Sequence, residues 1–206
     1  SERMLKRYDK AVSLDKIRRA AEATRRVGVH LSFYLMAGME GEGDDDIERT
    51  ILLLRTALPH DAIVSPVAYY PGTELYRRAK KENIISDAVW TQRDDPGIYV
   101  LDRKKSGRWI QRLLRASHAV ALRAAYGTAD FTGHRDVSGE DCWMTDLLEG
   151  DFYLESGDIG QAAEAYKRIT ERYPGNVWGY LKSAEALAET APAEAVRMLE
   201  QAAQLA

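Results

Sequence analysis

The chain has 206 residues, of which 45% are hydrophobic and 30% charged, and its 29 basic and 32 acidic side chains give a net charge of -3. This composition is typical of a globular protein with one or two cores, and it gives no indication of nucleic acid or an anionic membrane as a partner. No run of residues approaches the roughly 20 apolar residues that span a bilayer, and no signal-peptide pattern opens the sequence, so the predicted location is cytoplasmic.

Cys142 is the single cysteine. An intramolecular disulfide is therefore excluded, and an iron–sulfur cluster held by this chain would lack three of its four usual thiolate ligands. His134 is the nearest other candidate ligand, but two such residues without a paired spacing are a weak indication of a metal site. The sequence predicts no metal site in this chain.

The first part of the sequence predicts two helices. A short helix is expected around Met4 and Leu5, and Ser13 is a suitable N-cap for a second helix that runs to about Val27. Gly28 is a natural residue for the C-terminal turn of that helix, from which the chain would enter a strand.

The stretch from Val29 to Tyr76 predicts two consecutive βα units. Val29 to Met36 is apolar or amphipathic on both faces, a pattern that favours a parallel strand covered on both sides. A glycine-rich loop from Ala37 to Gly43 follows the strand. Asp44 to Asp46 would then begin a helix, whose apolar residues repeat every three or four positions until Pro59.

The second predicted strand runs from Ala62 to Tyr69, where Pro66 is tolerated at an edge or a bulge. Tyr70 to Gly72 would turn the chain, and Thr73 is a plausible N-cap for the next helix. Because ligands gather at the carboxyl ends of strands in such folds, the loops after the two strands form the predicted binding region.

Three segments carry a resemblance to a known family. They are Ser-Glu-Arg-Met-Leu-Lys at the start, Tyr-Leu-Met-Ala-Gly-Met-Glu-Gly-Glu from Tyr34, and Tyr-Tyr-Pro-Gly-Thr-Glu-Leu-Tyr from Tyr69. The sequence here resembles the second half of a radical S-adenosylmethionine (radical SAM) barrel, of the subgroup that often carries a cobalamin-binding domain. The family's usual loop is closer to Gly-Leu-Pro-Gly-Glu-Thr, so Met39, Glu40 and Gly43 are departures.

The resemblance implies a fold and a site. Residues 1–90 would be the C-terminal part of the barrel, an α/β partial (half) TIM-type structure. The loop after the first strand would lie near the adenine and ribose of SAM, the second loop would offer backbone contacts to the adenine, and the start of the chain would adjoin the ribose and amino acid portions. The cofactor-binding residues implied in this way are Glu2, Gly38, Met39, Glu40, Gly41, Ala68, Tyr69 and Tyr70.

The resemblance also implies an activity that this chain lacks alone. The family reduces SAM at an iron–sulfur cluster, held by three cysteines of a Cys-x-x-x-Cys-x-x-Cys loop that is absent here. We therefore expect SAM and a [4Fe-4S] cluster, with cobalamin possible, in a parent protein that supplies the rest of the barrel, and no cofactor on this chain alone. A half barrel leaves a sheet edge and an apolar face uncovered, so we expect later helices to cover them or the chain to dimerise.

Residues 91–142 read as a connecting segment. Mixed charged and apolar residues indicate a crossing stretch with one short strand around Ile98 to Leu101. A long helix is predicted from Ser106 to Tyr126, and a polar loop from Gly127 to Asp141.

Residues 143–206 are predicted to form helical hairpins that resemble tetratricopeptide repeats. One set of matching positions is Gly150, Tyr153, Gly157, Ala162, Tyr166 and Pro174, and a degenerate second set is Tyr180, Ala184, Leu187, Ala195, Leu199 and Ala202. Turns are expected at Gly157-Asp158 and Pro174-Gly175. Two repeats fall short of the roughly three that an independent solenoid needs, so this region would dock on the α/β part or on another copy. The alternative is an alanine-rich helical tail.

Two functions remain open at this point. The chain is either a fragment of a radical SAM oxidoreductase or transferase that contributes part of the SAM site, or a non-catalytic interaction module whose helices bind a protein partner. A third possibility is that the glycine loops only turn the chain in an ordinary α/β domain. Neither the substrate nor the reaction type follows from the residues.

Overall fold

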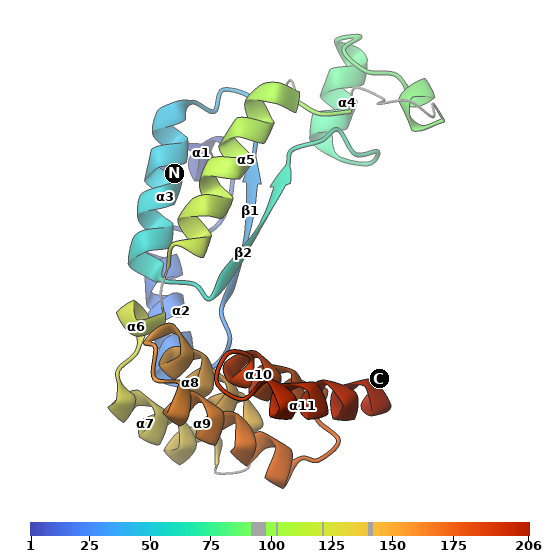
Figure 1. Ribbon diagram of the computed structural model, residues 1–206. Helices are drawn as coiled ribbons and strands as arrows, with labels where there is room; N and C mark the ends of the chain where they lie inside the picture. The colour runs from blue at the N-terminus through green and yellow to red at the C-terminus, as the bar shows by residue number, and fades with distance from the viewer. Residues whose placement is uncertain (92–97, 102, 121, 140–141) are drawn as a thin grey trace. The chain divides into compact units, whose positions relative to one another are not determined.

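The computed structural model describes residues 1–91, 98–101, 103–120, 122–139 and 142–206 (Figure 1). The chain forms two compact units. Unit 1 comprises residues 1–18 and 32–119, and unit 2 comprises residues 19–31 and 120–206. These units are defined by spatial contact, whereas the predicted divisions at residues 90 and 142 follow motifs along the sequence.

Unit 1 contains the two predicted parallel strands. β1 (Ser32–Ala37) and β2 (Asp61–Pro66) pair in parallel, with Ser32 opposite Asp61 and Ala37 opposite Pro66. α3 (Asp44–Ala57) connects them, and α5 (Arg103–His118) packs beside α3 on the same face of the sheet (Figure 1). The mixed α/β character predicted for this part of the chain is confirmed.

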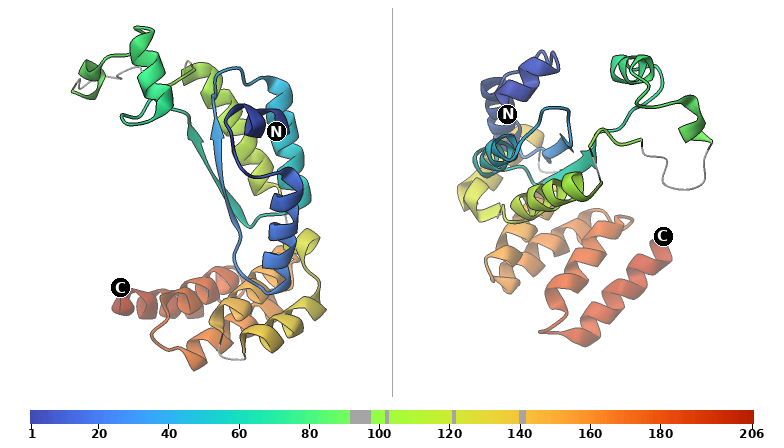
Figure 2. Two further views of the ribbon diagram at one scale, coloured as in Figure 1. Left: turned by 180° about the vertical axis from the view of Figure 1, so that it is seen from behind. Right: turned by 90° about the horizontal axis from the view of Figure 1, so that it is seen from above.

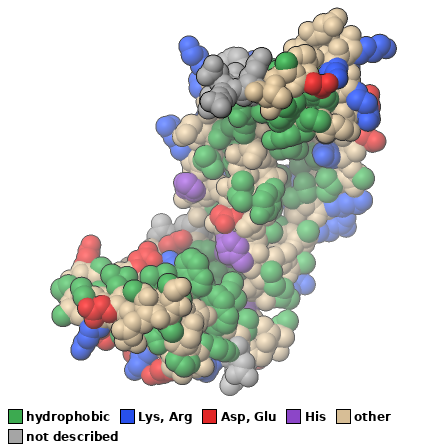
Figure 3. Space-filling model, turned by 90° about the vertical axis from the view of Figure 1, so that its right-hand side faces the viewer, with side chains coloured by type: hydrophobic (Ala, Val, Ile, Leu, Met, Phe, Trp, Pro, Cys, Tyr) green, Lys and Arg blue, Asp and Glu red, His purple; other side chains and the backbone are tan. Residues whose placement is uncertain are grey.

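The core of unit 1 lies between this face of the sheet and the two helices. Its buried residues are Ala37, Ile47, Ile51, Leu54, Ala62, Trp109 and Leu113. The opposite face of the sheet is open, with Tyr34 79% exposed and Ile63 49% exposed. The prediction that the first strand is covered on both sides is therefore wrong for the described residues, because α3 and α5 both pack on one side. Figure 3 shows hydrophobic side chains at the surface among charged ones.

The smaller elements of unit 1 follow the sequence closely. α1 (Glu2–Arg7) is the short first helix, and α4 (Glu74–Lys81) begins after Thr73, whose Oγ1 accepts the Tyr76 N–H at 3.2 Å. A short 3-10 helix, η1 (Asp87–Trp90), follows.

The short strand predicted around Ile98 to Leu101 does not form as a strand in the described residues, where a single antiparallel bridge pairs Ala68 with Tyr99. The N–H of Tyr69 donates to the Ile98 carbonyl at 2.7 Å. Residues 92–97 of the predicted crossing stretch lie outside the described residues.

The connection into unit 2 differs from the prediction. The long helix expected from Ser106 to Tyr126 is wrong in its second half, since α5 ends at His118 and a separate short helix, α6 (Leu122–Ala125), follows. Trp109 belongs to the core of unit 1, whereas Tyr126 is buried with Phe131 in unit 2. The apolar residues between Ser106 and Tyr126 therefore belong to two different cores and do not form one stripe of a single helix.

The polar loop expected from Gly127 to Asp141 is also wrong, because α7 spans Thr128–Ser138. Asp130 Oδ2 accepts the Gly127 N–H at 2.7 Å, which is one half of a capping box. Phe131 and His134 share one helix face and are both buried. The cap and the two buried residues therefore stabilise the helix in spite of the low helix propensity of Gly133.

In unit 2, the C-terminal end of α2 (Leu14–Arg26) confirms the predicted turn at Gly28. Gly28 has φ +69°, its N–H donates to the Arg25 carbonyl at 3.0 Å, and the Val29 N–H donates to the Thr24 carbonyl at 3.2 Å. This is the Schellman hydrogen-bond pattern. A Cβ at Gly28 would lie 2.7 Å from the His134 ring, so glycine also allows α7 to approach.

The rest of unit 2 is a series of packed helix pairs (Figure 2). α8 (Trp143–Glu155) pairs with α9 (Ile159–Arg172), and α10 (Val177–Leu187) pairs with α11 (Pro192–Leu205). The turns predicted at Gly157 and at Pro174-Gly175 fall between helices, as expected. No helix among the described residues combines the length and the apolar character needed to cross a membrane.

Candidate functional site

The Glu42 side chain forms hydrogen bonds to the backbone of the loop after β1. Gly38 is buried with φ +92°, a conformation that favours glycine. Oε2 of Glu42 accepts the Gly38 N–H at 2.7 Å and the Met39 N–H at 3.0 Å. Burial raises the pKa of Glu42, and the two N–H groups oppose that shift. Two amides that point toward one anion are therefore already occupied by a side chain of the chain itself.

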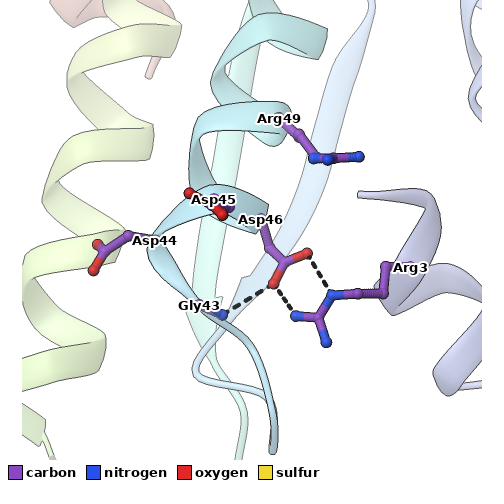
Figure 4. A pocket seen from close by; sticks show the side chains of 6 residues that line it. All are labelled: Arg3, Gly43, Asp44, Asp45, Asp46 and Arg49. Atoms are coloured by element: carbon purple, nitrogen blue, oxygen red, sulfur yellow. Dashed lines mark hydrogen bonds and ion pairs between the residues drawn. The ribbon is translucent and has the colours of Figure 1, made fainter.

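A buried carboxylate fixes the start of α3 beside this loop (Figure 4). Asp46, 3% exposed, accepts the Gly43 N–H at 3.0 Å, the Ser1 hydroxyl at 2.6 Å and the Arg3 guanidinium. Burial alone would raise the pKa of Asp46, but the hydrogen bonds from Arg3, Ser1 and Gly43 outweigh it and hold the pKa well below its ordinary value. Arg3 also donates to the Gly41 carbonyl at 2.8 Å, which joins α1 to the loop.

A cavity of about 420 Å³ adjoins this cluster. The residues that line it are Arg3, Gly43, Asp44, Asp45, Asp46 and Arg49. Its Asp46 carboxylate is already hydrogen-bonded to donors of the protein, and the wall also contains the guanidinium groups of Arg3 and Arg49.

A second charged group lies where the loop meets α1 and α4. The Glu40 carboxylate pairs with Arg78 of α4 and lies 3.8 Å from the Arg7 guanidinium of α1. The Tyr8 hydroxyl donates to the Glu40 carbonyl at 3.2 Å. A cavity of about 270 Å³ is lined by Arg7, Tyr8, Glu40, Glu74, Leu75 and Arg78.

A smaller cavity of about 140 Å³ also has Glu40 and Arg78 in its wall. Tyr69 contributes to its wall together with Glu40, Leu75 and Arg78. Burial raises the pKa of the Tyr69 phenol above its ordinary value. The structure thus brings one residue of each predicted loop, Glu40 and Tyr69, to the same cavity.

The predicted site residues Ala68, Tyr70 and Glu2 do not line this cavity. Ala68 is buried and bridged to Tyr99, and the Tyr69 N–H is taken by Ile98. Tyr70 is exposed with its ring 5.8 Å from that of Trp90, and Glu2 lies exposed in the first turn of α1.

Sequence reasoning missed the charged partners of the loop. Arg3, Arg7 and Arg78 come from helices that precede or follow the loop at a distance, and no spacing in the sequence links them to it. Asp46 carried a signal, because it is the third residue of a helix that begins after Gly43, a position that favours an acidic cap.

Unit 2 offers a separate aromatic cavity of about 620 Å³. It is lined by Trp143, Tyr173, Gly175, Asn176, Val177 and Trp178. His134 is buried in α7. Its ring packs edge-on against Tyr126 and Phe131, and the part of the chain that the structure describes contains no group of three or more metal-ligating side chains.

Comparison of the chain with protein-family models, curated proteins and solved structures finds no match. Any functional assignment therefore rests on the residues and their geometry.

Proposed function

We propose that the chain is the C-terminal part of a radical SAM barrel and contributes part of the SAM site within a larger protein. One observation carries the proposal. The glycine loop after β1 and the Tyr-Tyr-Pro-Gly segment after β2 lie at the same end of two adjacent, in-register parallel strands. This is the edge of an α/β sheet where ligands bind, and both segments resemble the family's motifs.

The open face of the sheet supports the same proposal. Parallel strands are nearly always covered on both faces, yet Tyr34 and Ile63 are exposed here. Further strands of a barrel would enclose these side chains in its interior. Within that site the Glu40 carboxylate is an acceptor suited to ribose hydroxyls, and Tyr69 is a neutral wall residue.

The residues of this chain do not fit the iron–sulfur cluster. Cys142 is the single cysteine, and it belongs to unit 2 rather than to the loops after the strands. The cluster ligands would come from sequence outside these 206 residues, as would a cobalamin domain. The role proposed for this chain is to bind and orient SAM.

The test uses the full-length protein after anaerobic cluster reconstitution. Reductive release of 5′-deoxyadenosine and about four irons per chain are expected of a radical SAM enzyme with one [4Fe-4S] cluster. Gly38→Val should then weaken SAM binding at least about tenfold, because a side chain at φ +92° strains the loop and its Cβ would lie 3.2 Å from Ser106.

The matched control is Gly157→Val in unit 2. Gly157 has φ +79°, but an added Cβ meets no atom within 4 Å, so this variant introduces similar backbone strain away from the loop. Unchanged SAM affinity in a folded Gly38→Val protein, or no SAM cleavage by the reconstituted protein, would contradict the proposal.

A second candidate is a non-catalytic interaction module, and the last helix favours it. Tyr166 of α9 is 0% exposed because α8 and α10 flank it, whereas Leu199, at the corresponding place in α11, is 49% exposed. Val196 lies one turn away on α11 and is also exposed. An apolar stripe of this kind suits another helix. A full-length protein that holds no iron and does not cleave SAM would favour this candidate.

A further inference from the structure

Arg7 has hydrogen-bonding capacity that the protein leaves unused. A guanidinium carries five N–H donors, yet that of Arg7 donates no hydrogen bond to any described residue, and its nearest acidic oxygen, Glu40 Oε1, is 3.8 Å away. The side chain is nonetheless positioned. It lies against Gly41, where φ is +77° and an added Cβ would approach Arg7 Cζ to 3.2 Å.

Arg78 faces the same cavity from α4. Its guanidinium pairs with Glu40 Oε2, so one carboxylate lies between two arginines. The other acidic residue of the wall, Glu74, is already paired with Arg77 at 2.6 Å. Arg7 and Arg78 together therefore exceed the remaining acidic charge of the cavity by one.

The remaining walls suit a small organic anion. Leu75 provides an apolar surface and Tyr8 a hydroxyl, in a cavity of about 270 Å³. The cavity is bordered by the loop after β1 and by the start of α4, so it lies at the carboxyl end of the sheet. That edge is where α/β folds bind ligands.

We propose that this cavity binds the carboxylate or phosphate group of a small molecule between Arg7 and Arg78, with Glu40 as the internal anion that the ligand displaces. Guanidinium groups recognise both anions through paired N–H donors. The inference shares Glu40 with the SAM proposal but does not rest on it, because its anion-binding groups are Arg7 and Arg78, which the family motifs do not include.

The test is an NMR titration of the ¹⁵N-labelled 206-residue chain, observed at the arginine Nε–H groups. Inorganic phosphate and succinate are titrated separately at constant ionic strength, which distinguishes phosphate from carboxylate ligands. At least one of them should shift the Arg7 and Arg78 resonances to saturation.

Variants decide whether the site is specific. Arg7→Gln and Arg78→Gln should each weaken binding about tenfold or more, because each substitution removes charge-assisted hydrogen bonds to the anion. Glu40→Gln should strengthen binding, because the competing anion is removed. Arg55→Gln is the matched control: it removes the same charge from an exposed position of α3, outside the cavity wall, and should change affinity less than about twofold.

Two outcomes would overturn the proposal. Equal losses in Arg55→Gln and Arg78→Gln would show nonspecific attraction to positive charge, and unchanged or weaker binding in Glu40→Gln would exclude displacement. If Arg78→Gln fails to fold, Arg78→Lys takes its place in the test. Lysine keeps the positive charge but lacks the paired N–H donors, so this variant should bind the anion more weakly than the unmodified chain does. SAM cleavage is measured independently, and its loss would leave this result unaffected.

Discussion

At the scale of single residues, Gly150 shows how closely α8 and α9 approach. A Cβ at this position would lie 2.2 Å from Cε1 of Tyr166, a side chain that is fully buried and whose hydroxyl donates to Asp151 at 2.7 Å. Gly150→Ala should therefore destabilise the chain by about 1–3 kcal/mol through overpacking. Urea unfolding followed by far-UV circular dichroism measures this change.

The control for Gly150 is Gly175→Ala, at the turn before α10. No atom lies within 4 Å of a Cβ added there, and the Gly175 φ is not in the left-handed region. Its stability should change by less than about 1 kcal/mol. Equal effects of the two substitutions would contradict close packing at Gly150.

Asp46 makes a pH-dependent contribution to stability. Its pKa in the folded protein is lowered, so its contribution is complete above the unfolded pKa of about 3.9 and is lost as pH falls below that value. Asp46→Asn should therefore differ most from the unmodified chain near pH 6, and the difference should shrink towards pH 3. Urea unfolding at several pH values, followed by tryptophan fluorescence, measures it.

The neighbouring exposed Asp45 provides the comparison for this experiment. Asp45→Asn changes the same charge at the start of α3 without touching the Arg3 network. Its effect should be small at every pH. A difference between Asp46→Asn and the unmodified chain that stayed constant with pH would show that ionisation of Asp46 does not contribute.

At the scale of elements, the charged cluster around Asp146 ties three helices together. Asp146 of α8 is buried and accepts from Arg135 of α7 at 2.7 Å and from Arg168 of α9 at 2.8 Å. Glu149, one turn further along α8, accepts from the same two arginines. The cluster replaces apolar contact in this part of unit 2.

Removal of Asp146 should take away the buried carboxylate that both arginines share and leave them Glu149 alone. Asp146→Ala is expected to cost about 1.5–3 kcal/mol, the range for hydrogen bonds to a charged group, whereas Glu171→Ala, which removes an exposed pair with Lys167, should cost less than about 1 kcal/mol. Chemical unfolding compares the two variants. A small effect of Asp146→Ala would indicate that Glu149 alone holds α7 against α8 and α9.

Local patterns predicted the elements that have strong signals of their own. The Thr73 cap, the Gly28 turn and the helix that starts at Asp44 each depend on residues within a few positions, and all three are present. α7 was missed because glycines at its start and middle outweighed two buried residues. The break after His118 depends on which core each residue joins, and periodicity alone does not contain that information.

The candidate site was predictable only in part. Glycine loops at strand ends can be recognised in sequence, and the family resemblance names Glu40 and Tyr69 as predicted site residues, which the structure places in the wall of one cavity. Their partners Arg7 and Arg78 belong to helices on either side of the two strands, and only the fold brings them to Glu40. The internal hydrogen bonds from Gly38 and Met39 to Glu42 were likewise invisible, because many acceptors could satisfy those amides.

At the scale of the whole molecule, the two candidate functions predict different surfaces of self-association. Under the barrel proposal, the surface expected to associate is the open sheet face of unit 1. A two-stranded parallel sheet with one uncovered face is only marginally stable in water. Under the interaction-module candidate, the surface expected to associate is the exposed apolar stripe of α11 formed by Val196 and Leu199. Tyr34 and Leu199 represent the two surfaces, and both are exposed.

Tyr34→Lys and Leu199→Glu separate these possibilities in the 206-residue chain. If the open sheet pairs with a second copy, Tyr34→Lys should lower the sedimentation coefficient towards that of a monomer, because charge on that face opposes burial, and Leu199→Glu should not. The reverse result would favour helix-mediated association and weaken the barrel proposal. In the full-length protein, a completed barrel would bury Tyr34, so the same lysine should reduce stability there instead of changing assembly.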